Sequence, residues 1–164
     1  MHPIPRLILV IAAVGVAVYV GINRSPGEVS ENERTEISST IRQTLQSYLD
    51  AIRTGGLTAE FAYLDSSSDF FWVPPGYTSA LTYDSVATIL RSNAPGFSLM
   101  DYRWEKLKIN PLHSTLAAYT GELHCISVDT AGNRSEYRML ETGTVIKRKA
   151  GWKILCGQSR IVEQ

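Results

Sequence analysis

The chain has 164 residues, and its sixteen lysine and arginine residues balance sixteen aspartate and glutamate residues. This length suits one domain with a hydrophobic core, and the balanced charge without a basic, aromatic-rich stripe argues against nucleic-acid binding. Three scattered histidines and two distant cysteines make no zinc-binding pattern, so we expect neither a metal nor another cofactor.

The first predicted element is an apolar segment at the N-terminus. Residues 7–22 carry no charge, and the preceding apolar residues bring the run close to the about twenty residues of a membrane-spanning helix. We expect residues 1–24 to be an uncleaved anchor that crosses the membrane through residues 4–22, with the domain outside the cytoplasm. The alternative is a cleaved signal peptide and a secreted or periplasmic domain, although the segment lacks a good Ala-x-Ala site. We expect residues 25–33 to be a linker and residues 34–164 to form the domain.

A long amphipathic helix is predicted next. Ser30 and Glu33 have the spacing of a capping box, and the Gly55-Gly56 pair marks the end of the helix. Between them, apolar residues recur every three or four positions and form one stripe. These residues are Ile37, Ile41, Leu45, Tyr48, Leu49 and Ile52.

Short elements are predicted in the centre of the chain. Residues 58–64 and 83–92 favour helices, and residues 69–73 favour a strand. The prolines at 74–75 would stop this strand and exclude it from the middle of a sheet. Residues 102–109 predict a further strand, ended by the Asn-Pro pair that follows it.

The last fifty residues predict three long antiparallel strands. These are residues 116–128, 135–148 and 152–161, and turns at 130–133 and 149–150 join them. Helices followed by such a meander predict an α+β domain in which the helices pack on one face of a curved antiparallel sheet.

The order and spacing of these elements resemble the nuclear transport factor 2-like superfamily, with the SnoaL-like proteins and the kinase association domains as its nearest branch. The resemblance covers about residues 31–162 and is carried by residues 41–53, the Gly-Gly-Leu step that follows, residues 69–76 and residues 147–154. It implies a cone-shaped half-barrel with a pocket between helices and sheet, commonly as a homodimer. The family contains isomerases, dehydratases and cyclases as well as members without chemistry, so function must be argued from the site.

Aligning the two C-terminal hairpins gives a candidate site. The turn at 130–133 would pair Glu122 with Glu141, and the turn at 149–150 would place Gln158 beside Glu141. A slip of one residue in either hairpin would move the affected strand's side chains to the other face. The predicted neighbours of this polar row are His124, Cys156 and Arg160.

Two interpretations of this row remain. Inside a pocket, Glu122 and Glu141 would repel each other, and one would keep its proton and serve a cofactor-independent lyase or isomerase as a general acid. At a surface or a dimer contact, both would be ordinary charges. Many relatives carry two histidines where this chain has Cys156 and Gln158, which weakens the enzyme interpretation. We therefore expect a non-catalytic ligand-binding or protein-association module, with a lyase, an isomerase or a subunit of an envelope assembly as alternatives.

Aromatic residues suggest what the pocket would bind. Tyr48, Trp72 and Tyr77 are predicted to lie around its mouth, where they would suit a small, flat or apolar ligand. The predicted register also places Cys125 and Cys156 on opposite faces and far apart, so we expect two free thiols.

Overall fold

The computed structural model describes residues 29–163 and confirms the predicted α+β architecture. Its helical elements are α2 (Glu31–Gly55), η1 (Leu57–Ala62), α3 (Tyr83–Asn93) and η2 (Ala94–Gly96). Its strands are β1 (Phe71–Val73), β2 (Phe97–His113), β3 (Leu116–Asp129), β4 (Arg134–Arg148) and β5 (Gly151–Glu163). The predicted anchor, residues 1–24, lies outside the described residues. Between residues 29 and 163, every helix is too short or too polar to cross a membrane.

Helix α2 begins where its capping box predicts. The Glu33 amide donates a hydrogen bond to the Ser30 hydroxyl oxygen, and the Ser30 amide donates one to the Glu33 carboxylate. Because the helix starts at Glu31, the last three residues of the expected linker are helical, and Val29 before them is already buried. The apolar stripe of α2 packs against the sheet, where Ile41, Leu45, Leu49 and Ile52 are among its most buried residues.

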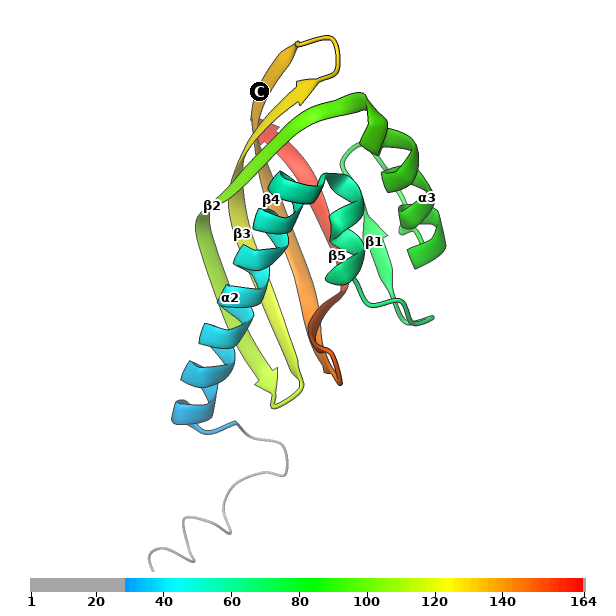
Figure 1. Ribbon diagram of the computed structural model, residues 1–164. Helices are drawn as coiled ribbons and strands as arrows, with labels where there is room; N and C mark the ends of the chain where they lie inside the picture. Colours follow the sequence, from blue (N-terminus) through cyan, green and yellow to red (C-terminus); the bar gives the residue numbers. More distant parts are fainter. Residues whose placement is uncertain (1–28, 164) are drawn as a thin grey trace, which may run out of the picture.

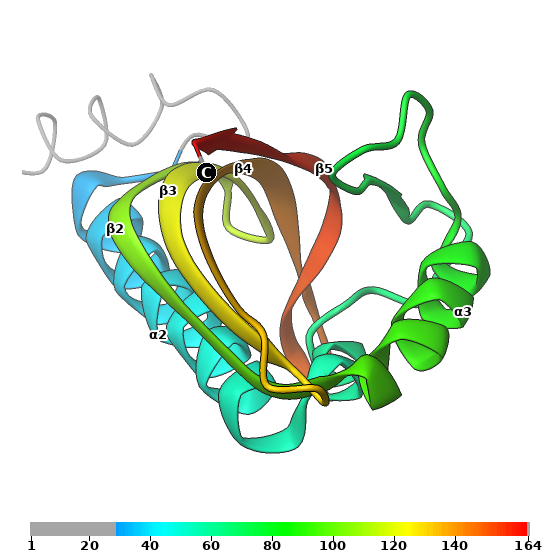
Figure 2. The same ribbon diagram turned by 90° about the horizontal axis from the view of Figure 1, so that it is seen from above.

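The sheet has the strand order β1-β5-β4-β3-β2. Its long strands are antiparallel, whereas β1 pairs with β5 in parallel as a short edge strand that ends before Pro74. The sheet curves, α2 crosses it on the concave side, and η1 and α3 lie beside the β5–β1 edge (Figures 1 and 2). The helices and the concave face of the sheet therefore enclose the interior between them.

Strand β2 is longer than predicted. It continues through Pro111 to His113, and the chain turns at residues 114–115 instead of at the Asn-Pro pair. Proline is tolerated here because β2 lies at the other edge of the sheet, where a missing amide hydrogen need not break a ladder. The predicted strand end at Asn110-Pro111 is wrong for this reason.

The β3–β4 register differs from the prediction by one residue. Gly121 pairs with Glu141, and Glu122 pairs with Leu140. The cause is the turn itself, because the Asp129 carboxylate accepts hydrogen bonds from the amides of Ala131 and Asn133. These bonds centre the turn on Ala131, half a residue earlier than predicted, and they place Glu122 and Glu141 on opposite faces.

The β4–β5 hairpin starts in the predicted register and then leaves it. Val145 pairs with Ile154 as predicted, but the next pair is Thr144 with Cys156, so the chain contains a bulge at Leu155. From Thr144 to Met139 every partner is displaced by one residue, and a second shift follows at Arg138. Ser159, and not Gln158, consequently lies beside Glu141.

Candidate functional site

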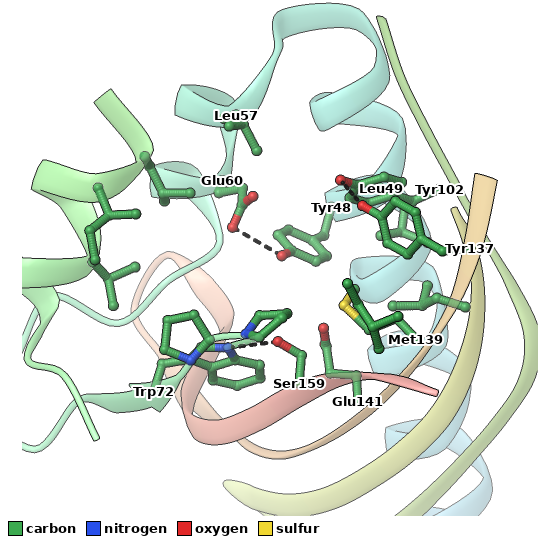
Figure 3. Close-up of a pocket in the computed structure, with 17 residues that line it drawn as sticks. Tyr48, Leu49, Leu57, Glu60, Trp72, Tyr102, Tyr137, Met139, Glu141 and Ser159 are labelled. Atoms are coloured by element: carbon green, nitrogen blue, oxygen red, sulfur yellow. Dashed lines mark hydrogen bonds between the residues drawn. The ribbon is translucent and has the colours of Figure 1, made fainter. Parts of the chain in front are cut away.

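A cavity of about 250 Å³ lies between the concave face of the sheet and the helices α2, η1 and α3 (Figure 3). Much of its wall is aliphatic, including Leu49, Leu57, Val86, Leu90, Leu123 and Met139. Its aromatic and acidic residues are Tyr48, Trp72, Tyr102, Tyr137, Glu60 and Glu141. Among the described residues that line it, none is lysine, arginine or histidine.

Glu141 projects from the inner face of β4 and is only 3% exposed. One of its oxygens, Oε1, accepts a hydrogen bond of 2.8 Å from the hydroxyl group of Tyr119 on β3. Burial raises the pKa of Glu141 to about 7, although the Tyr119 hydrogen bond favours the ionised form and opposes this shift. Near neutral pH, Glu141 is therefore divided between its protonated and ionised forms.

Glu60 is the second acidic group of the cavity and comes from η1. Its Oε2 accepts a hydrogen bond of 3.1 Å from the hydroxyl group of Tyr48 on α2. Burial raises the pKa of Glu60 to about 8; the Tyr48 hydrogen bond opposes the rise and the nearby Glu141 adds to it. Burial also raises the pKa of the Tyr48 and Tyr119 phenols, so both remain hydrogen-bond donors at neutral pH.

Glu60 was missed in the sequence, although its spacing offered a signal. It follows Leu57 by three residues within η1, and Leu57 is buried. In a 3-10 helix residues three apart lie above one another, so an acidic residue at this position is directed to the same side as Leu57. Only the polarity of glutamate, which is typical of a solvent-exposed position, concealed it.

The other polar groups of the cavity are hydrogen-bonded to one another. The indole Nε1 of Trp72 donates to the Ser159 hydroxyl oxygen at 3.3 Å, which ties β1 to β5. The hydroxyl groups of Tyr102 and Tyr137 lie 3.0 Å apart. These bonds restrain the aromatic rings, which line the cavity together with the two carboxyl groups (Figure 3).

Three of the residues selected from the sequence line this cavity. Tyr48, Trp72 and Glu141 contribute to its wall, from α2, β1 and β4 respectively. Tyr77 does not, because it lies in the loop after the two prolines and is 45% exposed.

Glu122 and His124 lie on the convex face of the sheet, away from the cavity. The Glu122 carboxylate forms an ion pair of 2.8 Å with Lys106 on β2. His124 lies 2.7 Å from a carboxylate oxygen of Glu136 on β4. The prediction that Glu122 faces Glu141 is wrong because the one-residue shift of the β3–β4 register pairs Gly121 with Glu141 and puts Glu122 on the opposite face.

The bulge in β5 displaces the remaining predicted residues. Gln158 and Arg160 are exposed, and Cys156 pairs with the outward-facing Thr144. Ser159, between Gln158 and Arg160, takes the inward position.

The thiols and metal-binding groups add no further site. Cys125, which is buried, and Cys156, which is half-buried, are both free. Within the described residues 29–163, no cluster of three or more histidine, cysteine, aspartate or glutamate side chains has the arrangement of a metal site.

Comparison with known proteins places this architecture in a family. A family model described as the SnoaL-like domain matches residues 41–160. No curated protein sequence matches the chain.

Solved structures show the same fold at low sequence identity. A protein described as a scytalone dehydratase from Novosphingobium aromaticivorans superposes with a TM-score of 0.71 at 14% identity, covering 81% of this chain and 89% of that one. A calcium/calmodulin-dependent protein kinase II association domain from Xanthomonas campestris gives 0.64 at 14% identity, covering 74% and 85%. A nuclear transport factor 2-like superfamily protein from Salmonella enterica gives 0.61 at 14% identity, covering 79% and 92%. The chain therefore belongs to the SnoaL-like domain family and has the nuclear transport factor 2-like fold.

Proposed function

We propose that this domain is a binding module that holds a small organic ligand in the cavity without transforming it. The observation that carries the proposal is the combination of an apolar, aromatic wall with two inward-facing carboxyl groups (Figure 3). Ligand pockets are commonly apolar with a few polar groups that orient the ligand. The cavity of about 250 Å³ lies just below the usual range of roughly 300–1,000 Å³, so a ligand with a single ring fits best.

The polar groups of the cavity favour binding over catalysis. The Trp72–Ser159 and Tyr102–Tyr137 hydrogen bonds satisfy these groups within the wall. Neither histidine nor lysine is found among the described residues that line the cavity, so an imidazole or amine base is missing there. Such a wall positions a ligand by shape and by hydrogen bonds to Glu60 and Glu141.

Native mass spectrometry of the full chain, extracted in mild detergent, tests the proposal. We expect a small adduct that survives gentle ionisation and is lost in Met139→Trp, which fills the cavity. Thr142→Trp is the matched control, because residue 142 lies on the same strand and is exposed on the convex face. If the folded wild type carries no adduct and gains no thermal stability from small aromatic compounds, a protein-association role becomes the better interpretation.

A second function, acid–base catalysis by a cofactor-independent lyase or isomerase, is supported by one observation. Glu141, with a pKa of about 7, and Glu60, with a pKa of about 8, favour a state near neutral pH in which one is ionised and the other protonated. A general base and a general acid facing one cavity need this arrangement. Conversion of the bound molecule by wild type, but not by Glu141→Gln, would establish catalysis; recovery of the molecule unchanged would support binding.

Membrane tethering and dimer formation complete the proposal. The apolar run at residues 7–22 supports an anchor through residues 4–22 with the domain outside the cytoplasm, or an exported domain after cleavage. Protease treatment of spheroplasts tests this location, because digestion only after lysis would contradict it. The same native mass spectra report whether the chain is a homodimer, as is common for this fold.

A further inference from the structure

We propose that the ligand is an organic cation, a small amine whose ammonium group is held between Glu60 and Glu141 while its apolar body contacts the aromatic wall. This inference rests on the proposed ligand-binding function and specifies the chemical class of the ligand. It follows from the charges that face the cavity, the hydrogen bonds that remain open there and the aromatic rings around them.

The two carboxyl groups have unused hydrogen-bonding capacity directed at the cavity. Glu141 accepts one hydrogen bond through Oε1 from Tyr119, and Glu60 accepts one through Oε2 from Tyr48. Within residues 29–163, Tyr119 and Tyr48 are the only donors to these two carboxyl groups, so Oε2 of Glu141 and Oε1 of Glu60 have no partner. Because no buried side-chain oxygen of these residues lacks a partner, the two oxygens must be accessible rather than sealed in the core. Because an ionised carboxylate accepts several hydrogen bonds, each group has a lone-pair site available to a ligand donor.

The protein compensates another buried carboxylate in a different way. Asp65 is 4% exposed, and the guanidinium of Arg148 donates hydrogen bonds of 2.6 and 3.2 Å to its two oxygens. Glu60 and Glu141 have no cationic partner among the residues that line the cavity. Because no built-in cation occupies the space that the two acids face, a ligand can supply the positive charge whenever these carboxyl groups are ionised.

An ammonium group fits this space better than the alternatives. It provides up to three N–H donors, enough for one oxygen of each carboxyl group. The faces of Trp72 and Tyr48 also attract cations through their ring quadrupoles. An anionic ligand would be repelled by both acids, whereas a neutral carbonyl compound would need a protonated carboxyl group as its donor. The cation and the carbonyl compound therefore predict opposite effects of pH on binding.

Three compounds of similar shape separate these possibilities: phenethylamine, phenethyl alcohol and phenylacetate. We expect full-chain protein in mild detergent to bind the amine at least about tenfold more tightly than the alcohol at about pH 8.5, and to bind phenylacetate more weakly than either. The affinity for the amine should fall at least about tenfold at about pH 6, because protonated carboxyl groups no longer attract a cation. Calorimetry in two buffers near pH 7 should show proton release on amine binding.

Substitutions locate the binding groups. Glu60→Gln and Glu141→Gln should each weaken amine binding at least about tenfold and leave binding of the alcohol nearly unchanged. Glu122→Gln is the matched control, since Glu122 is paired with Lys106 on the convex face. Circular dichroism checks that each variant is folded. The pH dependence of amine binding to the wild type tests the cation assignment without any variant.

Each outcome has a distinct meaning. If the alcohol binds as tightly as the amine, or if amine binding strengthens towards acidic pH, the cation assignment is overturned while ligand binding stands. If none of the three compounds binds the folded protein, the cation assignment is overturned, and the adduct in the native mass spectra decides separately whether the binding function stands.

Discussion

The hydroxyl group of Tyr119 on β3 donates a hydrogen bond of 2.8 Å to Oε1 of Glu141 on β4, at the base of the cavity. In the register, Tyr119 pairs with Gly143, so it reaches Glu141 diagonally, two residues away on the neighbouring strand. Gly143 leaves room for the Tyr119 ring, because a Cβ there would lie 2.9 Å from ring atom Cε1. Two opposing causes thus determine the pKa of Glu141: burial raises it, and this hydrogen bond lowers it.

Removing the Tyr119 hydroxyl should raise the pKa of Glu141 above its value of about 7. Tyr119→Phe deletes the donor that stabilises the carboxylate, while burial of the carboxyl group continues to favour the protonated form. Carbon NMR of the glutamate side-chain carboxyl groups, recorded across pH, measures the change. Tyr102→Phe is the control, because it breaks the Tyr102–Tyr137 hydrogen bond and leaves that of Glu141 intact. An unchanged or lower Glu141 pKa in Tyr119→Phe would contradict the assignment.

The stability of the domain should decrease as pH rises from about 5 to about 8. Glu141 and Glu60 have folded-state pKa values of about 7 and about 8, above the roughly 4.3 of an unfolded glutamate. The folded state therefore binds more protons in this window, and the free energy of unfolding falls with increasing pH. For Glu141 alone, the free energy of unfolding should decrease by an amount on the order of 2 kcal/mol across this window.

Urea denaturation of the wild type and of Glu141→Gln at about pH 5 and about pH 8.5 measures this effect. The variant should show a smaller decrease in stability, since glutamine has no proton to release. Glu122→Gln should retain the wild-type decrease, because Glu122 lies on the convex face beside Lys106. An equal decrease in all three proteins would show that Glu141 ionises normally.

The elements of the fold are predictable because their signals are local. The capping box at Ser30 fixes the start of α2, and the prolines after Val73 confine β1 to an edge. Alternation of residue types marks β3, β4 and β5, and their ends agree with the prediction to within a few residues. Each of these features depends on neighbouring residues in the sequence, so it can be read without the tertiary structure.

Which residues line the cavity depends on details that secondary-structure propensity does not encode. The hydrogen bonds of the Asp129 carboxylate centre one turn, and the bulge at Leu155 displaces the far half of β5. Each detail moves the register by one residue and thereby exchanges the two faces of a strand. The sequence therefore predicts Glu122 in the cavity, where the structure has Ser159 instead.

Breaking the Asp65–Arg148 pair should destabilise the domain at neutral pH. Hydrogen bonds from Arg148 lower the pKa of Asp65 to about 2, below the roughly 3.9 of an unfolded aspartate. The pair therefore contributes stability above the unfolded value, and this contribution is lost as pH falls through about 2. Arg148→Met should lower the urea midpoint at pH 7 and have little effect at about pH 2. Arg160→Met, an exposed position on β5, is the control and should leave both midpoints unchanged.

A methyl group at Gly121 should disrupt the packing between β2 and β3. A Cβ at this position would lie 2.5 Å from the Lys106 carbonyl oxygen and 2.6 Å from Cζ3 of Trp104. The indole cannot easily yield, because its Nε1 donates a hydrogen bond to the Leu45 carbonyl oxygen and its ring contacts that of Tyr119. We expect Gly121→Ala to reduce the free energy of unfolding by about 1–3 kcal/mol, the usual range for an overpacked core.

Gly96→Ala provides the comparison for this substitution. Its added Cβ would meet no atom within 4 Å, and its backbone does not require a positive φ. Thermal denaturation should therefore show a lower melting temperature for Gly121→Ala and a nearly unchanged one for Gly96→Ala. Because Tyr119 also holds the Glu141 carboxyl group, displacement of Trp104 should in addition alter the Glu141 titration. Equal melting temperatures would mean that β2 moves away from β3 at little cost, and would contradict the tight packing of Trp104 on Gly121.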